Sequence, residues 1–187
     1  MGLALGIPVL LLLCGGIGIG GYFLYRADVN RGTGSEVVDY RQKNPGILTR
    51  THATGRVNYP VTPPVGGDHS VYWQNCEGDV YADLIPSEHA VHSLEHGAVW
   101  VTYRPDLPRD DVNRLEDRVR GRDYLFMSHY PGLDRPISLQ AWGYQLKVDS
   151  ADDPDIDAFI QKYRRTASLE PGATCGSGST TLGTTPD

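Results

Sequence analysis

Histidine is the residue type that most clearly points to chemistry in this 187-residue sequence, and its distribution is uneven. All six histidines fall in one part of the chain, at His52, His69, His89, His92, His96 and His129. Three of them lie with glutamates in the short run from Glu88 to His96. If that run is helical, His89, His92 and His96 share one face, at i, i+3 and i+7. Neutral imidazoles grouped on one face can bind zinc or copper, so the sequence predicts a transition-metal site.

The candidate ligands can be ranked by their position in this run. We place His92 and His96 first, then His89, His69, His52 and His129. Glu95 is predicted to be a ligand or to orient one of the imidazoles. A structural interpretation stays open, in which the histidines and Glu95 form a buried hydrogen-bonded cluster that positions a loop. Met127, near His129, offers a thioether, but the pattern favours a core residue.

The run His92-Ser93-Leu94-Glu95-His96 also matches the HxxEH motif of zinc proteases, in which the glutamate activates water. Those enzymes are much larger and carry the motif on a long helix, whereas here Gly97 and a strand-like run follow at once. A small metallohydrolase using Glu95 is therefore the weaker alternative, and we assign no catalytic residue. The sequence contains no phosphate loop or dinucleotide fingerprint, so no nucleotide cofactor is expected.

The first 25 residues contain no charged side chain. Residues 3–25 are long enough to cross a bilayer as a helix, and they end in aromatic residues followed by Arg26. They predict an uncleaved single-pass anchor over residues 1–26 that contacts membrane lipid. Gly16 and Gly20 lie four residues apart, a spacing that would let this helix pack on another helix of a membrane complex.

Two signals disagree about the side of the membrane on which the rest of the chain lies. Arg26 and Arg31 follow the span and nothing basic precedes it, which favours a cytoplasmic domain. Cys76 and Cys175 form an even pair, which favours a disulfide in an exported domain. We expect the disulfide and an extracytoplasmic domain at the cell membrane, with Cys76 as a thiolate ligand the alternative. The net charge of −6 and the absence of a basic patch predict no nucleic-acid partner.

Beyond the anchor, the pattern predicts one compact domain of the α+β class. Strands are expected over 97–104, 123–129 and 136–148, and helices over 107–122 and 154–165. These elements suggest a small, mostly antiparallel sheet with two main helices. The predicted boundaries are a juxtamembrane linker at 27–46, the domain at 47–166, and a Gly/Ser/Thr-rich tail at 167–187 pinned at Cys175.

Several short motifs resemble a known bacterial family, the "domain of unknown function 3105" family. They are Pro63-Pro64-x-Gly66-Gly67-Asp68-His69, the segment Trp73 to Cys76, His92-Ser93-Leu94-Glu95-His96-Gly97, Tyr130-Pro131-Gly132 and Ala141-Trp142-Gly143. The resemblance covers roughly residues 35–170, and the HSLEHG run is its most specific part. It implies a small, single-span protein of the kind common in actinobacteria, and a specific role for the region around His92, Glu95 and His96. It supplies no catalytic residues, and the longer basic N-terminus of many members is missing here.

The sequence therefore favours a membrane-anchored extracytoplasmic domain that binds copper or zinc through its histidines, in metal handling or envelope maintenance. The alternative is a non-catalytic accessory subunit of a membrane complex, such as a respiratory assembly, with structural histidines. In neither case is enzymatic activity expected.

Overall fold

The computed structural model describes residues 35–187, and these form one compact unit. The predicted anchor over 1–26, with Gly16 and Gly20, lies outside the described residues. Within residues 35–187, no helix is long and apolar enough to cross a membrane.

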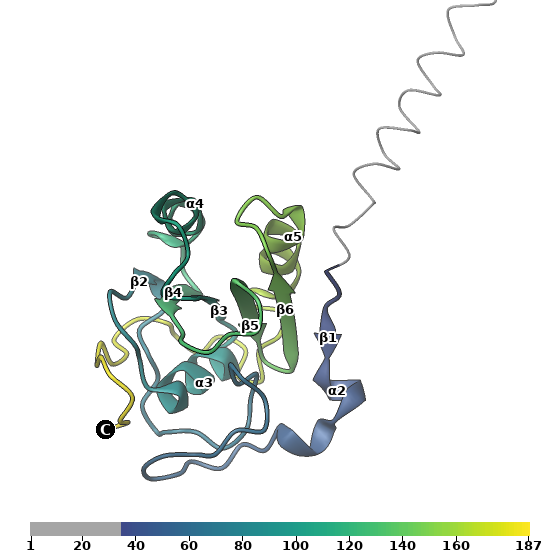
Figure 1. The fold of residues 1–187 in the computed structure, drawn as a ribbon. Helices are drawn as coiled ribbons and strands as arrows, with labels where there is room; N and C mark the ends of the chain where they lie inside the picture. The colour runs from purple at the N-terminus through teal and green to yellow at the C-terminus, as the bar shows by residue number, and fades with distance from the viewer. Residues whose placement is uncertain (1–34) are drawn as a thin grey trace, which may run out of the picture. The chain divides into compact units, whose positions relative to one another are not determined.

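The domain mixes a six-stranded sheet with helices (Figure 1), which confirms the α+β class. The strands are β1 (Val38–Asp39), β2 (Glu77–Val80), β3 (Val99–Tyr103), β4 (Leu125–His129), β5 (Ile137–Ala141) and β6 (Tyr144–Val148). The helices are α2 (Tyr40–Lys43), the 3₁₀ turn η1 (Pro45–Ile47), α3 (Ser87–His96), α4 (Arg109–Val119) and α5 (Pro154–Tyr163).

The strand order is β1-β6-β5-β3-β4-β2, and the sheet is mixed. The pairs β1–β6, β6–β5 and β5–β3 are antiparallel, while β3–β4 and β4–β2 are parallel. Three of these five pairs are antiparallel, so the sheet is mostly antiparallel as expected, and its β3-β4-β2 end is parallel. Helix α4 lies between β3 and β4 in the chain, and such a crossover connection is what parallel pairing of consecutive strands requires.

The single strand predicted over 136–148 is a hairpin of two strands. Residues Ile137–Ala141 and Tyr144–Val148 pair antiparallel around Trp142 and Gly143. Gly143 has a φ of 80°, a conformation that glycine adopts at little cost, so the chain reverses here. The apolar alternation on either side of this glycine was therefore the signature of two strands.

The two faces of the sheet are covered differently (Figure 1). Helices α4 and α5 lie on one side and pack on an apolar core that includes Val101 and Leu139. Helix α3 lies on the other side, over a second cluster that contains Trp100 and Phe126. Successive side chains of a strand point to opposite faces, which is why Val101 and its neighbour Trp100 belong to different clusters.

Both ends of the described chain are tied to the domain. The linker was predicted to extend to residue 46, but β1 pairs with β6 and the amide of Tyr40 donates to the carbonyl of Gly143 (2.8 Å). The tail is held by backbone hydrogen bonds from Asn75 to Ser179 (2.8 Å) and from Ser179 to Trp73 (2.7 Å). The Gly/Ser/Thr-rich composition of the tail correctly indicated that it forms no helix or strand. It gave no sign that the tail packs on the domain.

Candidate metal centre

Helix α3 carries most of the candidate site and is buried on nearly every side. Residues Glu88 to His96 are all buried. Ala90, Val91 and Leu94 face the sheet, as expected for an apolar stripe at helical spacing. Loops cover the polar side of the helix. One of them is attached to it by a hydrogen bond from the amide of Gln74 to the carbonyl of His89 (3.1 Å). Polar side chains on this helix are therefore enclosed by protein.

Two histidines reach α3 from the long loop between η1 and β2. His52 and His69 lie opposite each other in an isolated parallel β-bridge. The amide of Ala53 donates to the carbonyl of His69 (2.7 Å), and the amide of His69 donates to the carbonyl of Thr51 (3.1 Å). Backbone hydrogen bonds thus fix two distant parts of the loop side by side above the helix.

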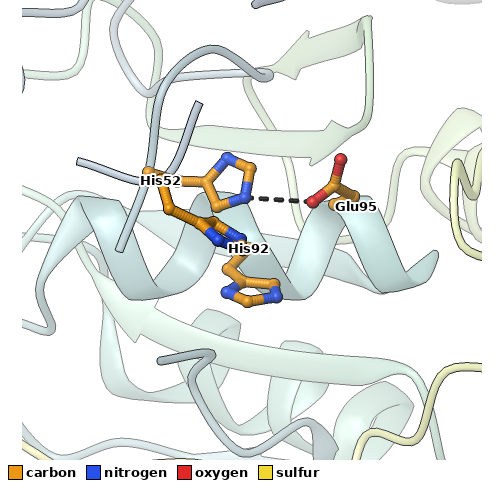
Figure 2. A group of neighbouring side chains, drawn as sticks. His52, His92 and Glu95 are labelled. Carbon is orange, nitrogen blue, oxygen red and sulfur yellow. Dashed lines mark ion pairs between the residues drawn. The ribbon is translucent and has the colours of Figure 1, made fainter. Parts of the chain in front are cut away.

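These residues converge on one point. His52, His69, His92 and Glu95 each offer one ligand atom, and the four atoms lie within 4.8 Å of one another. Figure 2 shows His92 and Glu95 on helix α3, with His52 on a segment that crosses it. The ring centroids of His69 and His92 are 4.9 Å apart, and those of His52 and His92 are 5.3 Å apart. His52 is exposed while the other three are buried, so the group is open to solvent on one side.

A second group of potential ligands adjoins the first. His92, His96 and Glu170 also offer ligand atoms within 4.8 Å of one another. The Nε2 atom of His96 lies 3.5 Å from a carboxylate oxygen of Glu170, and the rings of His92 and His96 are 4.7 Å apart. The two groups therefore meet at His92.

Three of the imidazoles are oriented by backbone carbonyls. The Nδ1 atoms of His69, His92 and His96 lie 2.8, 2.8 and 2.7 Å from the carbonyl oxygens of Gly67, Ser70 and Thr174. A carbonyl only accepts hydrogen bonds, so in the neutral ring each Nδ1 carries the proton and each Nε2 keeps its lone pair. Metal-binding histidines are usually fixed in this way by the nitrogen that does not bind the metal.

Glu95 is held against His69 inside the group. Its Oε2 atom lies 3.0 Å from Nε2 of His69, whose side chain is fully buried. A protonated His69 donates from this nitrogen to the carboxylate, and this contact favours the charged form of His69. A cation between the two side chains, either this proton or a metal ion, balances the buried negative charge of Glu95.

Burial and these neighbours set the protonation of the group. Burial lowers the pKa of His92 to about 4, and nearby His69 and His96 add to this effect. Burial also opposes the charged form of His69, but the Glu95 carboxylate and the Gly67 carbonyl outweigh it and raise the pKa of His69. The pKa of Glu95 is lowered, because its contact with His69 outweighs burial. At neutral pH, the His92 ring is uncharged, with a lone pair at Nε2 that could bind a metal, and Glu95 is a carboxylate.

The remaining candidates lie elsewhere. His129 lies 3.3 Å from a carboxylate oxygen of Asp83, and Nε2 of His89 accepts from the amide of Asp187 (3.3 Å). Neither belongs to a ligand group, although His89 shares the helix. Met127 is buried in the core beneath α4 and α5.

Cys76 and Cys175 form the expected disulfide, so neither is a thiolate ligand. The bond joins Cys76, directly before β2, to the C-terminal tail, across 99 residues of sequence. Thr174, whose carbonyl orients His96, is the neighbour of Cys175. The staple therefore also secures a contact of the second ligand group.

Gly97 explains why the tail can approach the end of α3. It closes the helix with a φ of 103°, and a Cβ at this position would lie 2.9 Å from Cβ of Ser168. The amides of Leu169 and Glu170 both donate to the carbonyl of Glu95, at 3.0 and 3.3 Å. Glu170 was missed in the sequence because it belongs to no motif, and its nearness to Cys175 was the only signal.

The comparison with known proteins agrees with the resemblance seen in the sequence. The family described as "Protein of unknown function (DUF3105)" matches residues 50–177. The chain belongs to this family. No curated protein and no solved structure gave a match. The DUF3105 region contains every member of both ligand groups, from His52 to Glu170, together with both cysteines of the disulfide.

Proposed function

We propose that this DUF3105 protein binds one transition-metal ion, zinc or copper, through His52, His69 and His92, with Glu95 as the fourth ligand. The observation that carries the proposal is the convergence of four donors from the loop and from α3 to within 4.8 Å. Nε2 of buried His69 faces the Glu95 carboxylate at 3.0 Å, so both potential ligand atoms point into the group.

The donor set favours a borderline divalent ion. Imidazole nitrogens suit Zn²⁺ and Cu²⁺, and three histidines with one carboxylate match the four-coordinate sites that zinc prefers. Donors at about 2.0–2.2 Å from a tetrahedral ion lie about 3.3 Å apart. Small side-chain rotations would bring the observed group to this spacing, and the exposed His52 has the most freedom to move.

The setting we propose is the outer side of a membrane. The Cys76–Cys175 disulfide fits an oxidising compartment, where such bonds persist. The uncharged run over residues 3–25 would supply a single-pass anchor in membrane lipid. In that position the domain would serve metal handling or envelope maintenance, and the family's presence in actinobacteria remains part of this expectation.

The proposal is tested by measuring bound metal on the full-length chain in detergent. Purified protein would be equilibrated with Zn²⁺ or Cu²⁺, dialysed and subjected to elemental analysis. His69→Asn and His92→Asn remove Nε2 but keep an amide N–H able to donate to the carbonyls of Gly67 and Ser70. His129→Asn is the matched control, because His129 lies outside both groups.

We expect about one ion per wild-type chain and per His129→Asn chain. Each of the other two variants should bind roughly 100-fold more weakly while keeping its circular dichroism spectrum, because it loses a ligand rather than a fold contact. Full metal retention by the folded His69→Asn and His92→Asn variants would reject the site.

The alternative of a non-catalytic accessory subunit makes a different prediction. In that case a Gly16→Leu change would abolish co-purification with a membrane complex, and histidine changes would act on stability alone. The metallohydrolase alternative requires that Glu95→Gln keeps the metal and abolishes turnover. In the structure, Glu95 is paired with His69 and lies on a ten-residue helix, which favours its role as a ligand or orienting group.

A further inference from the structure

His92 is shared by both ligand groups, and it can serve only one at a time. Its Nδ1–H is engaged by the carbonyl of Ser70, which leaves a single lone pair at Nε2. An ion in either group that uses His92 occupies that lone pair. The two groups, which we call the inner group (His52, His69, His92, Glu95) and the outer group (His92, His96, Glu170), cannot both be complete.

The two groups differ in donor number and in exposure. The inner group offers four donors and includes the fully buried His69. The outer group offers three, and 52% of the Glu170 side chain is exposed. A solvent-exposed carboxylate attracts cations at long range, whereas an additional donor holds an ion more tightly. The outer group is thus suited to capture and the inner group to retention.

We propose that His96 and Glu170 form a loading site for the inner metal centre, with His92 as the ligand common to both. This inference depends on the proposed function. The ion would first bind Glu170 and His96, then gain Nε2 of His92, and finally exchange the outer ligands for His69, His52 and Glu95. Each step replaces one donor by another at an ion of unchanged charge, so no oxidant or reductant takes part.

The backbone keeps the two groups close enough for such an exchange. Glu95 is a ligand of the inner group, and its backbone carbonyl accepts hydrogen bonds from the amides of Leu169 and Glu170. The segments that carry the Glu95 and Glu170 carboxylates are therefore joined by backbone hydrogen bonds. The ring of His92 lies 4.9 Å from that of His69 and 4.7 Å from that of His96. The shared imidazole therefore lies about equally far from a ligand of each group.

Stopped-flow loading of the full-length protein with Cu²⁺ tests the inference. Tryptophan quenching provides the signal, because the Trp73 ring lies 5.1 Å from His96 and the Trp142 ring lies 5.9 Å from His69. The variants are Glu170→Gln and His96→Asn. Asp149→Asn is the charge-matched control, since it removes a carboxylate that is 66% exposed and paired with Arg135 instead.

We expect both variants to load about tenfold more slowly, while the equilibrium affinity changes less than about twofold and the control loads at the wild-type rate. Unchanged loading in either variant would overturn the inference, as would a control that slows equally. So would two ions per wild-type chain, or an affinity that falls as far as the rate, since His96 and Glu170 would then belong to a final site. If the wild-type chain binds no Cu²⁺ at all, it is the proposed function that fails.

Discussion

The two faces of the sheet show two ways in which one scaffold buries side chains. On the α4 and α5 face, the buried cluster is made of apolar residues such as Leu115 and Phe159. On the α3 face, buried polar residues such as His69 and Glu95 stand beside the apolar ones. Burying a polar group is unfavourable unless it is partnered, so we expect the α3 face to contribute less to stability than the α4 and α5 face. Its buried polar side chains are those that could bind a ligand.

The covalent staple on the α3 face should have the largest effect on stability. Replacing both cysteines, as Cys76→Ser with Cys175→Ser, removes the constraint on a loop of 99 residues and should destabilise the domain by about 4–5 kcal/mol. The measurement is chemical denaturation followed by circular dichroism. The wild type in reducing agent is the parallel control and should lose a similar amount. A loss below about 1 kcal/mol would mean that packing alone holds the tail.

The apolar face should respond to truncation through stability alone. Leu115 lies on α4 and is fully buried, and Leu115→Ala should lower the free energy of unfolding by about 3 kcal/mol through lost burial and a cavity. At temperatures where the variant is folded, its metal stoichiometry should equal that of the wild type. His92→Asn should do the reverse, losing the metal at a stability change of about 1 kcal/mol or less. Equal effects of the two variants on both properties would remove the distinction between the faces.

The polar face should also make the metal-free protein sensitive to acid. Because the pKa of His92 is lowered to about 4 from the ordinary 6.5, the unfolded chain binds the proton more readily than the folded chain. The contribution of His92 to the free energy of unfolding is therefore fully present above about pH 6.5. It is lost as the pH drops toward 4, which lowers the stability by up to roughly 3 kcal/mol. The raised pKa of His69 acts in the opposite direction, since its stabilising effect is present at low pH and lost as the pH rises.

The contribution of His92 can be isolated by comparing variants in the presence of a chelator. His52, His69, His96 and Glu95 face His92, and the pKa values of His69 and Glu95 are also shifted, so the net curve includes their contributions. His92→Asn should flatten the decline between about pH 6.5 and 4 relative to the wild type, measured by urea denaturation at several pH values. His129→Asn should leave the decline unchanged. Parallel wild-type and His92→Asn curves would contradict the lowered pKa.

The sequence predicts what depends on local periodicity and misses what depends on the path of loops. The helices expected over 107–122 and 154–165 are α4 and α5, and the buried residues of α4, such as Val112, Leu115 and Val119, recur at helical spacing. The disulfide followed from the cysteine count. The parallel pairing of β3 with β4 did not follow, because strand order depends on contacts between distant segments.

The candidate site divides in the same way. The shared helical face of His92 and His96 was visible in their spacing, and the structure brings them together. His89 has the same helical spacing but contacts the C-terminal tail, because the loops cover α3 differently along its length. His52 and His69 join the site only through the β-bridge between them, which no local pattern encodes. Glu170 depends on the path of the tail, which Gly97 and Cys175 determine.

A smaller loss of stability than for the disulfide or Leu115 variants should come from a change at Gly97, where the α3 face meets the tail. Gly97→Ala places a Cβ in a left-handed conformation with a φ of 103° and 2.9 Å from Cβ of Ser168. The backbone strain alone should cost about 1–2 kcal/mol. Gly121→Ala is the matched control, because Gly121 follows α4 with a φ of 65° and open space around the new Cβ. Both variants should therefore show the backbone cost.

Only the Gly97 variant should also displace the segment that carries Glu170. We therefore expect Gly97→Ala to slow Cu²⁺ loading in the stopped-flow assay and Gly121→Ala to load at the wild-type rate. Equal loading by the two variants would mean that the tail adjusts without moving Glu170. A slower rate confined to Gly97→Ala would connect the glycine of the HSLEHG run to the loading of the metal centre rather than to the helix end alone, because Gly121 also follows a helix, directly after the C-cap Arg120.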